Sequence, residues 1–408
     1  MVPLEGVRVV DLTQTMAGPY CTMILADLGA DVIKVEPPVT GEMTRTMGVR
    51  MSGPDSAAFL AINRNKRGVT LDLKTDAGRE AVLALIATAD VVVENFRPGV
   101  ADRLGVGWDA LHERFPRLVH ASVSGFGQTG PYAHRPGFDL IAQGMAGVMS
   151  VTGAPDGAPV KSGMPVGDLS AGLYCAVAIV SALLGRERTG EGRRIDVSLV
   201  ESALSLAVWE SAELFATGEV PQRTGSAHRL TAPYQALATA DGWITVGANT
   251  PALWELLCRT IDREDLIDDD RFLDNADRMR NRAELQVELE RTLVEHPAHV
   301  WLERLDAAGF PAGPILDYAE VLADPHVLAR GMLQEYDHPV EGRARVIGSA
   351  LGHAGAEGGV RRPPPLLGEH NEEVLGEVLG TDGLARLIAS GATGPVGGVH
   401  EDDVEGER

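Results

Sequence analysis

Cysteine, aromatic residues and positive charge are all scarce in this sequence. Its 408 residues include three cysteines, 5% aromatic residues and 36 Lys+Arg against 58 Asp+Glu, which gives a formal net charge of −22 at pH 7. Such acidity argues against a nucleic-acid partner, because phosphate backbones are bound by Lys and Arg. The cysteines show no Cys-x-x-Cys or Cys/His spacing, so we expect reduced thiols and no metal site.

Long hydrophobic runs and targeting segments are also missing. The longest apolar run, around residues 173–184, is short for a membrane span and is interrupted by Ser181. The N-terminus has no basic segment followed by an apolar one. We therefore expect a cytoplasmic protein without a membrane partner. Its length and its 44% hydrophobic residues allow two or three domains with a large core.

Short apolar strands alternate with helical patterns through the first half of the chain. Strands are expected at 7–11, 31–35, 69–73, 91–93, 118–123 and 194–199. A helical pattern over 20–28 ends at Gly29, and another over 78–88 follows Thr75. Strand, helix and strand in this order predict an α/β fold with a parallel sheet and right-handed crossovers.

The strand–helix–strand pattern also suggests a dinucleotide-binding site, but the surrounding sequence does not match one. Glu36 ends the second strand, where a ribose-binding acid would stand, but the first turn lacks Gly-x-Gly-x-x-Gly. That motif occurs instead at 125–130, where it is followed by a Pro-rich loop rather than by a helix.

Composition divides the chain into four parts. Residues 217–231 are polar and aperiodic, and the block after them has two short strands joined at Asp241-Gly242 before a charged, largely helical stretch. A hairpin over 333–346, a helix over 371–379 and an acidic tail follow. We predict a large domain, a linker, a small α+β domain, and a return segment that completes the large domain, at 1–216, 217–231, 232–325 and 326–408.

Five cations stand close to predicted strand ends. Ligands of open α/β sheets bind at the carboxyl ends of the strands, so this group predicts an anion site, plausibly for phosphates. Its members are Lys66, Arg67, Lys74, Arg97 and Arg103.

Asp168 is the candidate reactive group. It lies in a Gly- and Pro-rich loop, and a long helix of small and apolar residues starts immediately after it and ends near Gly185. A helix N-terminus favours a charged carboxylate. Asp is also a favoured N-cap, so the local pattern leaves open whether Asp168 is a site or only a cap.

Several motifs in order resemble the class III CoA-transferases, the family that also contains carnitine CoA-transferases and 2-methylacyl-CoA racemases. The resemblance spans nearly the whole chain. It rests on Val9-Val-Asp-Leu-Thr with Ala17-Gly-Pro19, Ala30-Asp-Val-Ile-Lys-Val-Glu36, Asn63-Arg-Asn-Lys-Arg67, Asn95-Phe-Arg-Pro-Gly99, Ser124-Gly-Phe-Gly-Gln-Thr-Gly-Pro131, Pro136-Gly-Phe-Asp139, the Asp168 segment and Pro364-Pro-Leu-Leu-Gly-Glu-His370.

The resemblance implies a large Rossmann-like domain, a smaller domain and an interlocked homodimer. It implies that Asp168 is the nucleophile, which forms acyl anhydrides and an aspartyl-CoA thioester while CoA moves from an acyl-CoA donor, plausibly succinyl-CoA, to a carboxylic acid. Coenzyme A is then a substrate, and no cofactor is permanently bound. The CoA site that the family pattern implies consists of Met16, Ala17, Leu71, Asp72, Lys74, Asn95, Phe96, Arg97, Arg103, Phe138 and Asp139.

Two alternatives remain beside the transferase. Racemases of the family have a His where this chain has Phe138, which cannot take a proton, so a racemase would lack its second base. A non-catalytic CoA-binding protein is the other. Pro37-Pro38 stands where some members have an Arg, whose contact Arg45 or Arg64 would replace.

The acyl groups are not specified by these motifs. We expect the acyl pocket to be lined by a loop over 39–60, by the 125–130 loop and by the partner subunit. Arg45 or Arg50 is a candidate for the far carboxylate of a dicarboxylic acid.

Overall fold

The structure is a computed structural model of the chain, and it describes residues 2–351 and 359–394. The predicted acidic tail from His400 lies outside these residues. Internal contacts divide the chain into two units. The first comprises Met1–Val148, Ser162–Val208 and Pro325–Arg408, and the second comprises Met149–Lys161 and Trp209–Asp324.

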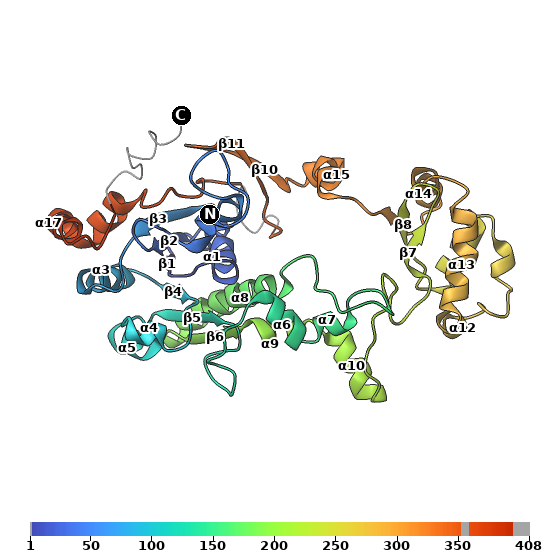
Figure 1. Cartoon of the computed structure of the whole chain (residues 1–408), viewed down its shortest axis with the longest axis horizontal. Coiled ribbons are helices and arrows are strands. Elements are labelled where there is room, and N and C mark those ends of the chain that lie inside the picture. The colour runs from blue at the N-terminus through green and yellow to red at the C-terminus, as the bar shows by residue number, and fades with distance from the viewer. Residues whose placement is uncertain (1, 352–358, 395–408) are drawn as a thin grey trace. The chain divides into compact units, whose positions relative to one another are not determined.

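The first unit is built on a six-stranded sheet of order β3-β2-β1-β4-β5-β6 (Figure 1). All five neighbouring pairs are parallel, which confirms the predicted parallel sheet. The strands are β1 (Arg8–Asp11), β2 (Asp31–Glu36), β3 (Lys66–Thr70), β4 (Val91–Glu94), β5 (Val119–Ser124) and β6 (Arg194–Ser198).

Apolar side chains project from both faces of this sheet, and strands β1, β2 and β4 are rich in Val and Ile. On one face Val9 and Val32 pack with helices α1 (Ala17–Asp27) and α8 (Val166–Thr189). On the other face Val10 and Ile33 pack with α3 (Asp76–Ile86) and α17 (Gly376–Ala389).

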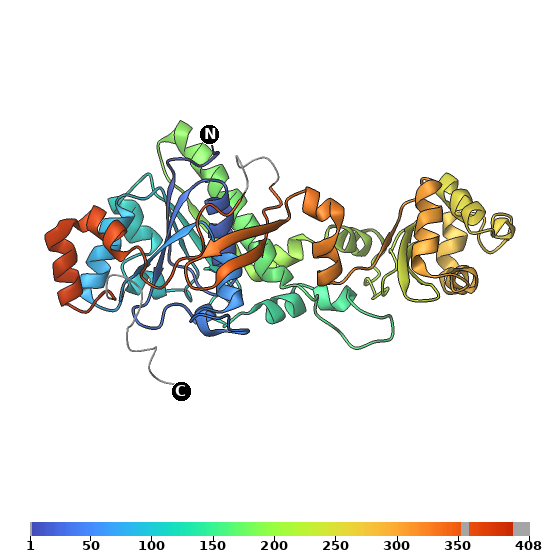
Figure 2. The ribbon, with the colours of Figure 1, turned by 90° about the horizontal axis from the view of Figure 1, so that it is seen from above.

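The C-terminal part of the chain returns to the first unit. The hairpin of β10 (Leu333–His338) and β11 (Gly342–Ile347) is antiparallel, as predicted. Asn371 then accepts a hydrogen bond from the Thr70 N–H at 2.8 Å and donates one to Thr70 Oγ1 at 2.9 Å. Residues 362–371 lie along the outer edge of β3, where the Asn65 N–H donates to the Arg362 carbonyl and the His370 N–H donates to the Gly68 carbonyl, each at 2.9 Å. Helix α17 lies beside α3 (Figure 2).

The remaining helical segments of the first unit are short. They are η1 (Met43–Thr46), α2 (Ala57–Ile62), α4 (Val100–Arg103), α5 (Trp108–Arg114), α6 (Asp139–Met145), α7 (Val148–Val151) at its border, α9 (Leu199–Ser205), α16 (Pro325–Ala329) and η4 (Asn371–Leu375). The segment 39–60, expected to be a loop, therefore contains η1 and the start of α2.

Helix α8 passes a length and composition test for a membrane span. Its most apolar window has a mean hydropathy of 1.7. The expectation that this run is too short is therefore wrong, because the helix continues to Thr189. A core helix of a soluble protein passes the same test, and α8 packs closely on α1: a Cβ added at Gly172 would lie 2.8 Å from the Ala17 carbonyl oxygen.

The second unit has an antiparallel sheet of order β7-β8-β9. Its core gathers Trp254, Phe272 and Trp301. Its elements are α10 (Val208–Thr217), β7 (Tyr234–Ala238), β8 (Trp243–Gly247), α11 (Pro251–Thr260), η2 (Glu264–Leu266), α12 (Asn275–Arg280), α13 (Arg282–Leu293), α14 (Ala298–Ala307), β9 (Ala312–Pro314) and α15 (Tyr318–Ala323).

The Gly and Pro residues of β9 show no strand pattern, and only pairing with β8 makes this segment a strand. Helices α9 and α10 are separate, because α9 ends at Ser205. The border between the units follows Val208, so residues 217–231, predicted to be a linker, fall within the second unit.

Candidate active site

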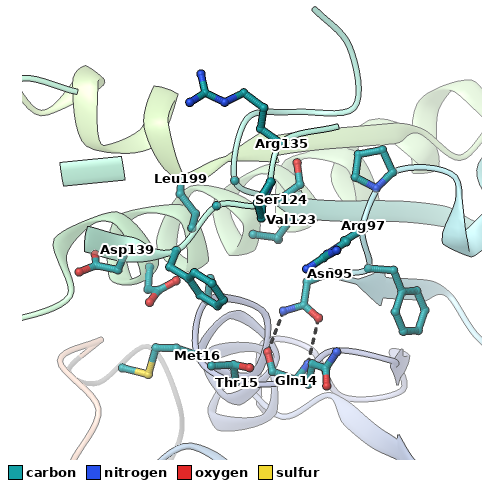
Figure 3. Close-up of a pocket in the computed structure, with 18 of the residues that line it drawn as sticks. Gln14, Thr15, Met16, Asn95, Arg97, Val123, Ser124, Arg135, Asp139 and Leu199 are labelled. Carbon is teal, nitrogen blue, oxygen red and sulfur yellow. Dashed lines mark hydrogen bonds between the residues drawn. The ribbon is translucent and has the colours of Figure 1, made fainter. Parts of the chain in front are cut away.

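Two adjoining cavities open at the carboxyl ends of the strands in the first unit. Each has a volume of about 470 Å³. Gln14, Phe96 and Val100 line both, so the two cavities share a wall. We call the one that contains Asp168 the first cavity, which Figure 3 shows, and the other the second cavity.

Most of the predicted site residues lie on these cavities. The first cavity is lined by Met16, Ala17, Asn95, Phe96, Arg97, Phe138, Asp139 and Asp168. The second is lined by Leu71, Asp72, Lys74 and again Phe96. Arg103 lines neither of these two cavities and is exposed on α4.

Asp168 is the third residue of α8 and does not cap the helix. The N-cap position is Pro165, which provides no side-chain hydrogen bond. The carboxylate of Asp139, on α6, instead accepts the Gly167 N–H at 2.8 Å. The cap expected of Asp168 is therefore provided by another helix, and this leaves the Asp168 carboxyl on the cavity wall.

Gly167 makes this contact possible. A Cβ at that position would lie 3.1 Å from Asp139 Oδ1 and 3.3 Å from the side chain of Ala142. The glycine therefore admits the carboxylate of Asp139 to the start of α8. At Gly163, by contrast, no atom lies within 4 Å of an added Cβ.

The carboxyl group of Asp168 has a raised pKa. Burial, followed by the neighbouring charge of Asp139, raises it to about 7. Contrary to expectation, the helix end therefore does not keep this group fully charged near pH 7. A helix N-terminus favours the ionised form by up to ~2 kcal/mol in a partly buried site, but burial and the like charge of Asp139 outweigh it.

Gln143 was missed by the sequence analysis. Its side chain is fully buried and donates to Asp139 Oδ2 at 2.7 Å, while its own oxygen accepts the Ser162 N–H at 2.8 Å. Asp139 and Gln143 stand four residues apart on α6, a spacing at which Gln and Asp side chains meet. That spacing was the available signal.

The turn after β1 forms another wall of the first cavity. Thr15 has φ +75°, which is unusual for a β-branched residue. Its N–H donates to Glu42 Oε2 at 2.7 Å, and Lys34 Nζ lies 3.1 Å from Glu42 Oε1. Gln14 and Asn95 exchange two hydrogen bonds, drawn dashed in Figure 3.

Two of the five cations predicted to bind an anion form internal ion pairs instead. Lys66 is fully buried, and its Nζ lies 3.0 Å from Asp11 Oδ2. Although burial opposes ionisation, Lys66 and Lys34 hold the pKa of Asp11 well below its usual range. Arg67 pairs with Asp31 and Glu373. Strand β3 begins at Lys66 rather than at 69, and this places both cations inside the sheet.

Arg45 and Arg64 are likewise engaged. Arg45 is buried between Glu36 and Asp55, at 2.7 Å and 2.8 Å, and despite burial these carboxylates raise its pKa. Arg64 pairs with Asp27 at 2.7 Å. Neither guanidinium is free to replace the missing family contact to CoA, and Arg45 is not free to bind the far carboxylate of a dicarboxylic acid, so the structure contradicts these suggestions. Arg50 is exposed and does not line either cavity.

Two arginines line the first cavity. Asn95 and Arg97 lie side by side on one wall in Figure 3, with Asp139 on the other side of the view. Arg135, which the sequence analysis did not select, stacks on Tyr132 with its guanidinium carbon 4.6 Å from the ring centre. In Figure 3 its guanidinium points away from the other labelled side chains.

Glu94 supports the loop that holds Asn95 and Arg97. Its carboxyl accepts a hydrogen bond from the Phe96 N–H at 2.7 Å, and burial raises its pKa to about 7.

The Gly-x-Gly-x-x-Gly motif has a packing role: a Cβ at Gly125 would lie 2.8 Å from the Cα of Gly137.

Within residues 2–351 and 359–394, no group of three His, Cys, Asp or Glu side chains is placed to hold a metal ion.

Comparison with known proteins places this site in a family. The model of "CoA-transferase family III" matches residues 4–371. The succinyl-CoA:glutarate CoA-transferase of Mus musculus is 39% identical over 96% of this chain and 90% of its own length. The acetyl-CoA:oxalate CoA-transferase of Acetobacter aceti is 43% identical over 81% of this chain and 85% of its own.

Solved structures agree with this result. The crystal structure of a CaiB/BaiF family protein from Brucella suis has a TM-score of 0.83 and 39% identity, covering 92% of this chain and 99% of that one. The chain therefore belongs to CoA-transferase family III, and it is an enzyme.

Proposed function

We propose that this enzyme moves CoA from succinyl-CoA to a second dicarboxylic acid, with Asp168 as the nucleophile. The support for the nucleophile is its place: Asp168 stands on the first cavity at the start of α8 while Asp139 takes the capping role. The donor is inferred from relatives named for succinyl-CoA with glutarate, mesaconate or citramalate.

The bound CoA thioester extends across both cavities in this proposal. Lys74 on the second cavity receives the phosphate end, and the shared wall at Phe96 leads the pantetheine arm into the first cavity. Arg97 and Asn95 face that arm, and the thioester carbonyl lies at Asp168. Arg103 would reach the phosphates only from outside the second cavity.

The reaction then consists of four acyl transfers. The ionised carboxylate of Asp168 attacks the thioester carbonyl, and CoA thiolate leaves an aspartyl-acyl anhydride. The thiolate attacks the aspartyl carbonyl, which releases the donor acid and leaves an aspartyl-CoA thioester. The acceptor carboxylate displaces the thiolate to form a second anhydride. The thiolate attacks the acceptor carbonyl, which yields the new acyl-CoA and frees Asp168.

A racemase is the alternative activity at this site. It would need a second base for the α-proton opposite Asp168. Phe138 occupies the position expected of that base, lines the first cavity and is 66% exposed. A phenyl ring cannot exchange a proton, and this favours transfer.

We further propose a homodimer with interlocked subunits in the cytoplasm. One side of α8 leaves Leu173, Val177 and Leu184 between 45% and 67% exposed at helical spacing. A second copy of the chain would cover this apolar stripe. Size-exclusion chromatography with light scattering tests the dimer, and a monomer at micromolar concentration would contradict it.

Mass spectrometry of acyl exchange tests the activity. Succinyl-CoA is incubated with glutarate, oxalate or mesaconate, and hydroxylamine traps the activated carboxyl. The expected result is a new acyl-CoA and hydroxamate at Asp168, both lost in Asp168→Ala and retained in the exposed-surface control Asp76→Ala. Exchange by Asp168→Ala at the wild-type rate would refute the mechanism.

A second assay separates the alternatives. Deuterium uptake at the α-carbon of 2-methylacyl-CoA without acyl exchange would indicate a racemase. CoA binding with neither deuterium uptake nor acyl exchange would indicate a binding protein.

A further inference from the structure

The short segment before and within the first turn of α8 is held at both ends by side chains of α6. At its beginning, the Ser162 N–H donates to Gln143 Oε1 at 2.8 Å. At its end, the Gly167 N–H donates to Asp139 Oδ1 at 2.8 Å. Asp168 directly follows the second of these attachments, so any movement of the segment displaces the carboxyl group.

Gln143 connects the two attachments. Its amide nitrogen donates to Asp139 Oδ2 at 2.7 Å and approaches the Met164 carbonyl oxygen at 3.4 Å. One fully buried side chain therefore holds the start and middle of the segment, and it also holds the carboxylate that caps α8. Gln143 itself does not line the first cavity, so it has no contact with a ligand there.

The chemical identity of this side chain also matters. A carboxamide donates with one end and accepts with the other, and here Asp139 requires a donor while the Ser162 N–H requires an acceptor. Met, which has a similar volume, can do neither. Glu accepts from Ser162 in both protonation states but donates to Asp139 only when it is protonated.

We propose that Gln143 is a positioning residue for the nucleophile: it fixes the Ser162–Asp168 segment so that the Asp168 carboxyl meets the bound thioester. This inference rests on the proposed role of Asp168. A displacement of about 1 Å from the reactive geometry costs on the order of 10²-fold in rate. The inference therefore predicts a loss in the chemical step with little change in CoA binding.

Two variants and one matched control test this proposal. Gln143→Met removes both functions of the amide, and Gln143→Glu retains the acceptor. Gln286→Met is the control, because Gln286 donates to Glu290 on α13 of the second unit. The measurements are CoA affinity by calorimetry, thermal unfolding, and the single-turnover rate at which succinyl-CoA modifies Asp168.

We expect Gln143→Met to modify Asp168 on the order of 10²-fold more slowly with unchanged CoA affinity, and Gln286→Met to match the wild type. Gln143→Glu should regain rate toward acid, since the like charge of Asp139 raises the pKa of the new carboxyl and its protonated form donates as Gln does. Asp168, which follows Gly167 on α8, must be ionised to react. The variant should therefore have a bell-shaped pH profile where the wild type has a rising one.

Specific outcomes would overturn the proposal. If Gln143→Met modifies Asp168 at the wild-type rate, Gln143 has no positioning role. If Gln143→Glu shows the wild-type pH profile, the donor to Asp139 is irrelevant, and this arm decides the question even where Gln143→Met does not fold. Absence of Asp168 modification in the wild type would instead refute the proposed function.

Discussion

Two walls of the first cavity are held in place by different means. The turn after β1 is held by buried charges: Lys34 binds Glu42, which receives the Thr15 N–H, while Lys66 binds Asp11. The turn that leads to Asp168 is held by an amide and one carboxylate, Gln143 and Asp139. The charges behind the β1 turn are paired with one another, whereas at Asp168 burial and the like charge of Asp139 raise the pKa.

This difference separates stability from reactivity. Breaking a buried ion pair leaves an uncompensated charge and costs folding free energy. Pairing Asp168 with a cation would lower its pKa, and it would also reduce its readiness to attack a carbonyl. The site therefore keeps its ion pairs on the wall that does not react, and the four predictions below test that separation.

The largest effect is expected at the nucleophile itself. Asp168→Asn keeps the shape of the side chain and removes its nucleophilic oxygen, so acyl exchange should fall by at least ~10³-fold. Removal of a like charge beside Asp139 should leave stability equal or higher. Exchange kinetics and urea unfolding measure both, and a strongly destabilised Asp168→Asn would contradict the separation.

The buried ion pairs behind the β1 turn should affect stability. Lys66→Met leaves the buried Asp11 carboxylate without the ammonium that pairs with it, and the expected loss is about 3–5 kcal/mol of unfolding free energy. Urea unfolding measures it. Arg343→Met, which breaks the surface pair with Glu335, is the control and should leave the midpoint unchanged. Equal stability of the two variants would show that the buried network does not support the fold.

Arg97 tests the binding role of the first cavity. Arg97→Met removes a charge-assisted contact to CoA, and we expect KM for succinyl-CoA to rise by about tenfold with kcat nearly unchanged. Arg103→Met is the matched control, since Arg103 is exposed and lines neither cavity. A larger effect at Arg103 than at Arg97 would place the phosphates elsewhere.

The smallest effect concerns pH. The Asp168 carboxyl must be ionised to attack, so kcat/KM should rise with pH through about 7. The same shift lowers stability: between the ordinary pKa of 3.8 and about 7, the folded protein retains a proton that the unfolded chain has lost. Raising the pH through this range should therefore reduce the unfolding free energy, and Asp168→Asn should flatten that slope. An unchanged slope would assign the raised pKa to another group.

The strand pattern predicted the sheet well because parallel strands buried on both faces are local apolar runs. Strands β1, β2 and β4 agree with expectation within one residue. Strand β3 was placed too late, because Lys66 and Arg67 resemble surface residues until Asp11 and Asp31 are brought beside them. Charge in a sequence does not show whether its partner is water or a distant carboxylate.

The site was predicted in the same uneven way. The motifs placed Met16, Asn95 and Asp168 on one cavity, since each lies at the end of a strand or the start of a helix. Arg45 was wrongly predicted to bind a ligand, because only the folded chain brings Glu36 and Asp55 within ion-pair distance of its guanidinium. Gln143 had a usable local signal in its spacing from Asp139, but its bond to Ser162 spans a loop.

The sequence by itself determined the parallel sheet, the family and Asp168 as the reactive candidate, because these follow from short apolar runs and motif residues. The tertiary structure alone decided that Asp139 caps α8 in its place, that burial raises the pKa of Asp168 to about 7, and which cations remain for a ligand. The physical reason is that burial and Coulomb interactions depend on distances between residues that folding brings together, and such distances are not local in the chain.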